Sequence, residues 1–211
     1  MRPNFGDTLP PWAASAALAV GVAIVLVPIL SYLTKRQAEA ATPPEQEGTL
    51  GDPVNAKAQA NFGPLLFLPD PQPNNPEAIR ITNGWDQNNI TYIKPPGFNR
   101  TIPWNKKCVS QLNDLFSAWS GAGLIPQIIQ WNGSWNPRFV RGQRKYLSNH
   151  TFATAFDINA QWNPMGVAAA GPGEYGNVQD LAAIATAQGR RWGGNYPAGQ
   201  QDGMHFERLS C

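Results

Sequence analysis

The sequence predicts an α+β domain in which helices flank a small antiparallel sheet, and three observations support this fold class. Two segments, 108–121 and 178–188, carry apolar residues at helical spacing. Short apolar runs bounded by Pro, Asn or Gly indicate strands at 65–68, 90–93 and 124–131. Helices and strands in separate runs of this kind are typical of an α+β fold.

Both predicted helices have recognisable ends. The segment 108–121 places five apolar side chains on one face and ends at a glycine, Gly121. The segment 178–188 follows Asn177, which is a favourable N-cap residue, and stops before Gly189. Each helix therefore has one apolar face to lay on a sheet.

Composition excludes two broad classes of protein. The chain has 211 residues, of which 42% are hydrophobic, and this is too apolar for a chain that is disordered throughout. Sixteen basic and fourteen acidic residues give a net charge of +2, so no large positive field is available to bind a nucleic-acid backbone. The composition predicts one modest domain with appendages and no nucleic-acid partner.

The N-terminal appendage is a candidate membrane anchor. After a short tail, 1–11, residues 12–33 are apolar and long enough to cross a bilayer as one helix, which makes the lipid membrane an expected partner. A cleaved signal peptide and a buried core helix are the alternatives. The anchor is favoured over the signal peptide because signal peptides have a shorter apolar stretch and a small-x-small cleavage site. Flanking charges are almost balanced, so they leave the orientation open.

Two further segments precede the predicted domain. Residues 34–61 are rich in Ala, Pro, Glu and Gly, which predicts a flexible linker. Residues 62–104 are rich in Pro and Asn, and we expect them to pack on the C-terminal domain rather than fold alone. The domain itself is expected to cover residues 105–211.

Both histidines of the chain lie in short segments that also carry acidic residues. These segments read SNHTFATAFDIN over 148–159 and DGMHFE over 202–207. Together, His150, Asp157 and His205 offer two imidazole nitrogens and one carboxylate oxygen, which is a ligand set suited to catalytic zinc. In an arbitrary domain, buried histidines and a capping aspartate are the commoner explanation.

The residues around these positions resemble those of zinc peptidases in the D-alanyl-D-alanine carboxypeptidase and L-alanyl-D-glutamate endopeptidase family. Residues 148–157 are similar to the family motif S-x-H-x-x-G-x-A-x-D, with Ala153 at the glycine position. Residues 133–142 (GSWNPRFVRG) resemble the arginine-bearing segment of the endolysin-like branch. Residues 190–207 resemble its terminal W-G-G and D-x-x-H-F-E segments, so the resemblance extends over about 104–211.

This resemblance implies a role for each matching residue. The implied roles are zinc ligation by His150, Asp157 and His205, general-base catalysis by Asp202, binding of the oxyanion or substrate by Arg138, and substrate binding by Ser148 and, as second choice after Arg138, by Arg141. For both arginines the alternative is a surface side chain that solvates a turn, and this alternative is stronger for Arg141. For Asp202 the alternative is a turn residue, because Asp-Gly is a common turn pair. Glu207 either orients a ligand histidine or is a plain carboxylate at the end of a strand.

The sequence does not decide the backbone conformation of Ala153 or the state of the two cysteines. If Ala153 takes the left-handed backbone conformation that suits glycine, about 1 to 2 kcal/mol of strain follows. Cys108 and Cys211 either form a bridge that ties the ends of the domain together or remain free thiols.

The implied function is that of a membrane-anchored, zinc-dependent peptidase that cleaves peptidoglycan stem peptides between L- and D-residues. The endolysin-like segments favour the L-Ala–D-Glu bond. The expected location is the periplasmic or wall side of a membrane, or a virion membrane, with other envelope or virion proteins as candidate partners. Alternatives are a D-Ala–D-Ala carboxypeptidase and a non-catalytic structural protein with a peptidase-like domain.

Overall fold

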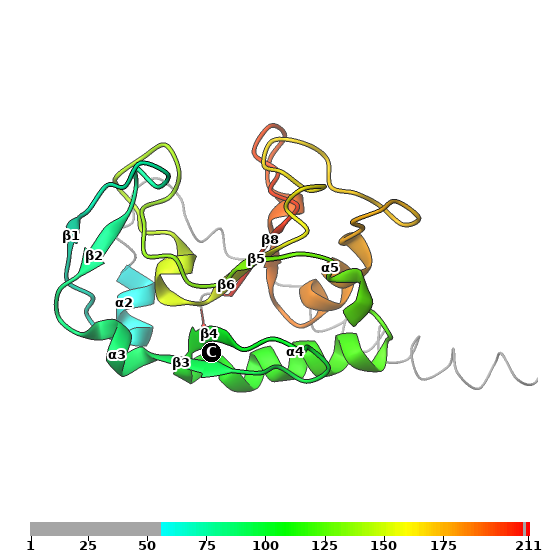
Figure 1. Cartoon of the computed structure of the whole chain (residues 1–211), viewed down its shortest axis with the longest axis horizontal. Coiled ribbons are helices and arrows are strands. Elements are labelled where there is room, and N and C mark those ends of the chain that lie inside the picture. The colour runs from blue at the N-terminus through cyan, green and yellow to red at the C-terminus, as the bar shows by residue number, and fades with distance from the viewer. Residues whose placement is uncertain (1–55, 209) are drawn as a thin grey trace, which may run out of the picture. The chain divides into compact units, whose positions relative to one another are not determined.

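The computed structural model describes residues 56–208 and 210–211, and these form an α+β fold (Figure 1). A four-stranded antiparallel sheet has the strand order β5-β6-β8-β7. Its strands are Trp131–Gly133 (β5), Ala155–Ile158 (β6), Arg191–Trp192 (β7) and His205–Glu207 (β8). The main helices are Val109–Gly121 (α4) and Gln179–Ala187 (α5). The predicted fold class is confirmed.

Smaller elements precede and connect these parts. The helices are Ala56–Phe62 (α2) and Trp85–Asn89 (α3), and the strands are Phe67–Pro69 (β1), Ile79–Ile81 (β2), Ile90–Ile93 (β3) and Ile102–Asn105 (β4). Antiparallel pairs join β1 with β2 and β3 with β4. Short 3-10 helices lie at Lys106–Cys108 (η1), Ile125–Gln127 (η2), Asn149–Phe152 (η3) and Gly193–Asn195 (η4).

The four-stranded sheet has an aromatic face and a polar face, because successive side chains of a strand point to opposite sides. On the aromatic face, the Phe156 ring stacks on Phe206 with ring centroids 5.3 Å apart, and on Trp131 with centroids 5.4 Å apart. On the polar face, Asp157 of β6 is paired directly with His205 of β8. The core and the polar face are thus two sides of the same strands.

Both predicted helices are confirmed with shifts of one residue. The helix predicted over 108–121 begins one residue later than expected. The helix predicted over 178–188 begins at Gln179 and ends at Ala187. The N-cap residue is Val178 and not Asn177 as predicted, because the helix begins one residue later; Asn177 Oδ1 still accepts a hydrogen bond from the Gln179 N–H at 2.9 Å, from one position before the N-cap.

The strand predicted over 124–131 is wrong for most of its length. Residues Ile125–Gln127 form the 3-10 helix η2, and strand β5 begins only at Trp131. Pro126 explains the difference, because proline has no backbone N–H to donate to a strand ladder and is readily accommodated at the start of a helix.

The N-terminal end of the described chain also corrects one prediction. The predicted linker, 34–61, is too long, because Ala56–Phe62 form α2 and bury Phe62 in the core. The predicted tail, 1–11, and the predicted transmembrane helix, 12–33, lie outside the described residues. Within 56–208 and 210–211, no helix is both long and apolar enough to span a bilayer.

A disulfide bond joins Cys108 and Cys211, which are 103 positions apart in the sequence. Of the two alternatives for these cysteines, the structure therefore shows the bridge. In the chain-entropy description, closing a loop of about 100 residues contributes up to about 4.7 kcal/mol to the free energy of unfolding. The bond ties the start of α4 to the segment that follows β8.

Ala153, just after η3, has the left-handed backbone conformation that the sequence raised as an alternative, with φ 51° and ψ 45°. Its side chain is completely buried. Because Cβ crowds the backbone in this conformation, Ala153 stores strain that a glycine would not.

Matched glycine substitutions measure this strain. Ala153→Gly and Ala155→Gly each delete one fully buried methyl group, but only Ala153 is at positive φ. We expect Ala153→Gly to reduce the free energy of unfolding by about 1 to 2 kcal/mol less than Ala155→Gly, as measured by urea denaturation followed by tryptophan fluorescence. Equal losses in the two variants would show that Ala153 is unstrained.

Candidate metal centre

His150 is presented by the 3-10 helix η3, whose two ends are fixed by hydrogen bonds. At the start, Ser148 Oγ accepts a hydrogen bond from the His150 backbone N–H at 3.3 Å. At the end, the Asn105 N–H donates to the Ala153 carbonyl at 3.1 Å, and Asn105 Nδ2 donates to the Phe152 carbonyl at 3.0 Å. The last residue of β4 therefore sets the position of this helix.

The middle of η3 is anchored by aromatic packing. The fully buried Phe152 ring contacts Trp85 at a centroid distance of 5.6 Å and Phe62 at 6.2 Å. Both partners come from the N-terminal part of the described chain. Burial of these rings holds the backbone that carries His150 against that part.

Three donor atoms converge where η3 meets β6 and β8. Asp157 Oδ1 lies 2.9 Å from His205 Nδ1 and 3.2 Å from His150 Nε2, and these two imidazole nitrogens are 3.2 Å apart. Atoms that bind one zinc ion tetrahedrally at about 2.0 to 2.1 Å lie about 3.3 Å from one another. The structure therefore brings together the three predicted ligands in a group that fits one zinc ion.

The other nitrogen of each imidazole has its own acceptor. His150 Nδ1 lies 3.3 Å from the Ser134 carbonyl oxygen, and His205 Nε2 lies 3.1 Å from Glu207 Oε2. Since carbonyl and carboxylate oxygens only accept, these nitrogens carry the hydrogens, and in the neutral imidazoles His150 Nε2 and His205 Nδ1 present lone pairs. A positive charge between these two nitrogens and the Asp157 carboxylate stabilises the arrangement, and either a metal ion or a proton can supply it.

Electrostatics also favour a positive charge at this point. Burial raises the pKa of Asp157, but hydrogen bonds and positive charge from His150 and His205 outweigh it and hold the pKa well below its usual range. Burial lowers the pKa of His205, yet its hydrogen bonds to Asp157 and Glu207 raise it to about 10. The two carboxylates lie at opposite ring nitrogens of His205 and therefore stabilise a positive charge on that ring.

Glu207 is the centre of a buried polar network behind His205. Its Oε1 accepts hydrogen bonds from Tyr196 Oη at 2.7 Å and from Arg191 Nη1 at 3.1 Å, while its Oε2 accepts from Asn149 Nδ2 and His205. Burial raises the pKa of Glu207, but the hydrogen bond from His205 and the charges of His205 and Arg191 lower it to about 2. These contacts support the ligand-orienting alternative for Glu207.

Asp202 and Arg138 are two further charged groups that interact electrostatically with the metal ligands. Asp202 Oδ1 is buried and has no hydrogen-bond partner among the described residues. Burial raises the pKa of Asp202, and the Asp157 charge raises it further, whereas His205 lowers it. Burial lowers the pKa of Arg138, and the carboxylates of Asp157 and Asp202 raise it. The Arg138 guanidinium is thus within electrostatic range of both.

The remaining predicted substrate contacts have structural partners. Arg141 Nη1 lies 2.8 Å from Glu77 Oε2 and 3.1 Å from Asn75 Oδ1, which joins its loop to the turn between β1 and β2. Ser148 caps η3. Substrate binding by Arg141 and Ser148 stays a prediction.

Sequence reasoning missed the partners of Glu207. The only indication in the sequence that Asn149 contributes to the site is its position directly before the ligand His150. Tyr196 lies in the loop after β7, eleven positions from Glu207, and no spacing rule connects them.

Residues 141–208 match the family model described as D-alanyl-D-alanine carboxypeptidase. These residues belong to that zinc peptidase family. The match contains all three converging ligands, whereas Arg138 lies just before it. The protein is therefore a zinc metallopeptidase that acts on peptidoglycan, with zinc as its cofactor. Neither the curated proteins nor the solved structures give a match to this chain.

The network behind His205 predicts a change in metal affinity. Glu207→Gln keeps the size of the side chain but removes the carboxylate that accepts from His205 Nε2. We expect zinc affinity to fall about 10- to 100-fold, measured by competition with a chromophoric chelator. The control is Glu77→Gln, which breaks the Arg141 ion pair away from the metal ligands and should leave zinc affinity unchanged. Unchanged affinity in Glu207→Gln would remove its orienting role.

Proposed function

We propose that this peptidase hydrolyses the stem peptide of peptidoglycan at a bond between an L- and a D-residue. The observation that carries the proposal is the convergence of His150 Nε2, Asp157 Oδ1 and His205 Nδ1, with the unpartnered carboxylate oxygen of Asp202 three residues from a ligand. A complete ligand set together with an available acid-base group is what hydrolysis of a peptide bond requires, and it argues against a purely structural role.

Several residues of the chain have separate roles in the proposed reaction. Zinc, when bound, supplies a Lewis acid that makes water a better nucleophile near neutral pH. Asp202 Oδ1 takes the proton of the attacking water and later returns it to the leaving amine. Arg138 donates hydrogen bonds to the carbonyl oxygen of the substrate as negative charge develops there. Glu207 and the Ser134 carbonyl keep the two imidazoles oriented.

We propose L-Ala–D-Glu as the preferred bond. The support is the similarity of 133–142 and 190–207 to the endolysin-like branch of the family. A D-Ala–D-Ala carboxypeptidase is the second candidate, favoured by the description of the matching family and by Arg138, whose cation could hold a terminal carboxylate. Mass spectrometry of digested walls separates the two, because a carboxypeptidase releases single D-Ala residues and the endopeptidase cuts stem peptides from the glycan.

Asp202→Asn tests the proton-transfer step. The substitution keeps size and turn geometry but removes the base, so we expect kcat to fall about 10²- to 10⁴-fold while zinc content stays at one ion per chain. Asp157→Ala should instead reduce zinc content. If Asp202→Asn retains near-normal activity and zinc, Asp202 is only a turn residue and takes no part in proton transfer.

We also propose that residues 12–33 anchor the enzyme in a membrane with its C-terminal domain on the wall side. Such an anchor serves a cell envelope or the membrane of a phage particle. The disulfide between Cys108 and Cys211 supports this location, because disulfides persist in oxidising compartments and are rare in the cytosol.

Protease protection tests this orientation. In intact spheroplasts that make the full-length chain, added protease should remove the C-terminal domain while a cytosolic marker stays intact. Cleavage only after lysis would instead indicate a cytosolic enzyme that is released when the membrane ruptures.

The disulfide bond makes a separate prediction: alkylation of the unreduced protein should modify neither Cys108 nor Cys211.

A further inference from the structure

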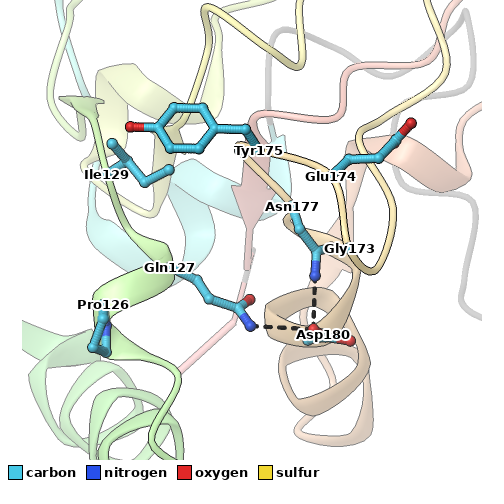
Figure 2. A pocket seen from close by; sticks show the side chains of 9 residues that line it. Pro126, Gln127, Ile129, Gly173, Glu174, Tyr175, Asn177 and Asp180 are labelled. Carbon is cyan, nitrogen blue, oxygen red and sulfur yellow. Dashed lines mark hydrogen bonds between the residues drawn. The ribbon is translucent and has the colours of Figure 1, made fainter.

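We infer that a pocket between η2 and the segment before α5 is a subsite for the glycan strand of peptidoglycan and holds an amino-sugar ring beside the peptide that is cut. The pocket has a volume of about 530 Å³, within the usual range for small-molecule sites. Figure 2 shows Tyr175 and Ile129 along one side of it and Asp180 with its amide partners at another. This inference rests on the proposed function and extends it to the carbohydrate part of the substrate.

The apolar side of the pocket presents an aromatic ring. Tyr175 is 68% exposed, although large aromatic side chains are normally buried. Its ring packs on Trp162, with centroids 4.9 Å apart in an edge-on arrangement. Ile129 is also exposed and lines the same pocket. A flat, supported, exposed ring suits the C–H face of a pyranose, which is apolar while its edge is polar.

The polar side of the pocket offers hydrogen-bonding groups of neutral or acidic type. Asp180 Oδ2 accepts hydrogen bonds from Asn177 Nδ2 at 2.7 Å and from Gln127 Nε2 at 3.1 Å (Figure 2). Gln127 Oε1 is buried and has no hydrogen-bond partner among the described residues, which leaves an unsatisfied acceptor in the wall of the pocket that a hydroxyl or an acetamido N–H could satisfy after a rotation of the side chain. None of the nine residues that line the pocket is Lys or Arg, which disfavours an anionic ligand.

The walls of the pocket are tied to the strand that carries a metal ligand. Asn159 follows β6 directly, two residues after Asp157, and is fully buried. Its Oδ1 accepts from the Ile129 N–H at 2.9 Å, and its Nδ2 donates to the carbonyl oxygens of Gln127 at 2.7 Å and Gly176 at 3.4 Å. One side chain therefore holds both walls together, which preorganises the pocket relative to β6.

A glycan in this pocket can carry its peptide to the metal ligands. Ile129 is four residues before Gly133, which is paired with Asp157 across the sheet. Four residues span at most about 14 Å, because an extended chain advances about 3.3 to 3.6 Å per residue. The L-Ala–D-Glu bond is separated from the glycan by a single residue, which spans only about 3.3 to 3.6 Å, so the ring in the pocket would belong to a sugar further along the strand than the one that bears the cut peptide.

Two tyrosines of equal exposure give a matched test. Tyr175→Ala removes the ring from the pocket, and Tyr92→Ala removes a ring that is 67% exposed on β3. With the full-length enzyme and a muropeptide that retains its sugars, we expect Tyr175→Ala to raise KM about tenfold with kcat unchanged. Tyr92→Ala should leave both constants unchanged, and Tyr175→Phe should restore the parent KM. On the same stem peptide without sugar, all variants should match the parent.

Direct binding completes the test. The trimer of N-acetylglucosamine should bind the parent enzyme and Tyr92→Ala in calorimetric titration, and its binding should be lost in Tyr175→Ala. Equal KM values for Tyr175→Ala and Tyr92→Ala on the sugar-bearing substrate, or no trimer binding by the parent, would overturn the subsite. If the parent enzyme does not cleave the sugar-free peptide, the proposed function is contradicted instead. The two failures are therefore distinguishable.

Discussion

The register between β6 and β8 is the constraint on which the rest of the structure depends. It places Asp157 opposite His205 on one face of the sheet and stacks Phe156 on Phe206 on the other. A shift of one residue would exchange the two faces, driving a carboxylate and an imidazole into the aromatic core and exposing the rings. Burial of the rings therefore stabilises the register, and the register positions two metal ligands. The same hydrophobic free energy that folds the domain builds its metal centre.

The polar face of the sheet follows from the need to satisfy buried polar groups. A buried carboxylate is costly unless hydrogen bonds and opposite charges compensate it, and Glu207 has four such partners, among them Tyr196 and Arg191. These contacts also determine which nitrogen of His205 carries a hydrogen. In contrast, Asp202 keeps one buried oxygen without a partner among the described residues. The groups that orient the ligands are satisfied, and the group proposed to move a proton is left available.

The third ligand depends on residues far from the matched family segment. His150 lies on a short 3-10 helix, which cannot hold its own position without tertiary contacts. Phe62 and Trp85 contact the Phe152 ring of that helix, and Asn105 hydrogen-bonds its end. The N-terminal part of the described chain is thus a structural component of the metal centre. Asn159 links the centre to the neighbouring pocket in a similar way, through hydrogen bonds from a single buried side chain.

Local periodicity and short motifs in the sequence were sufficient to predict the fold class, both main helices and the residue types of a zinc site. These features can be predicted from local sequence because the helix and strand periods repeat over neighbouring positions. Tertiary structure decided what local patterns do not encode. It joined Cys108 to Cys211 and placed Tyr196 on Glu207, since such pairs lie far apart in the chain. It also turned an apolar run into η2 at Pro126, because one missing N–H outweighs strand propensity. The ligand residues could be predicted from the sequence, whereas the packing of distant segments brought their donor atoms to one point.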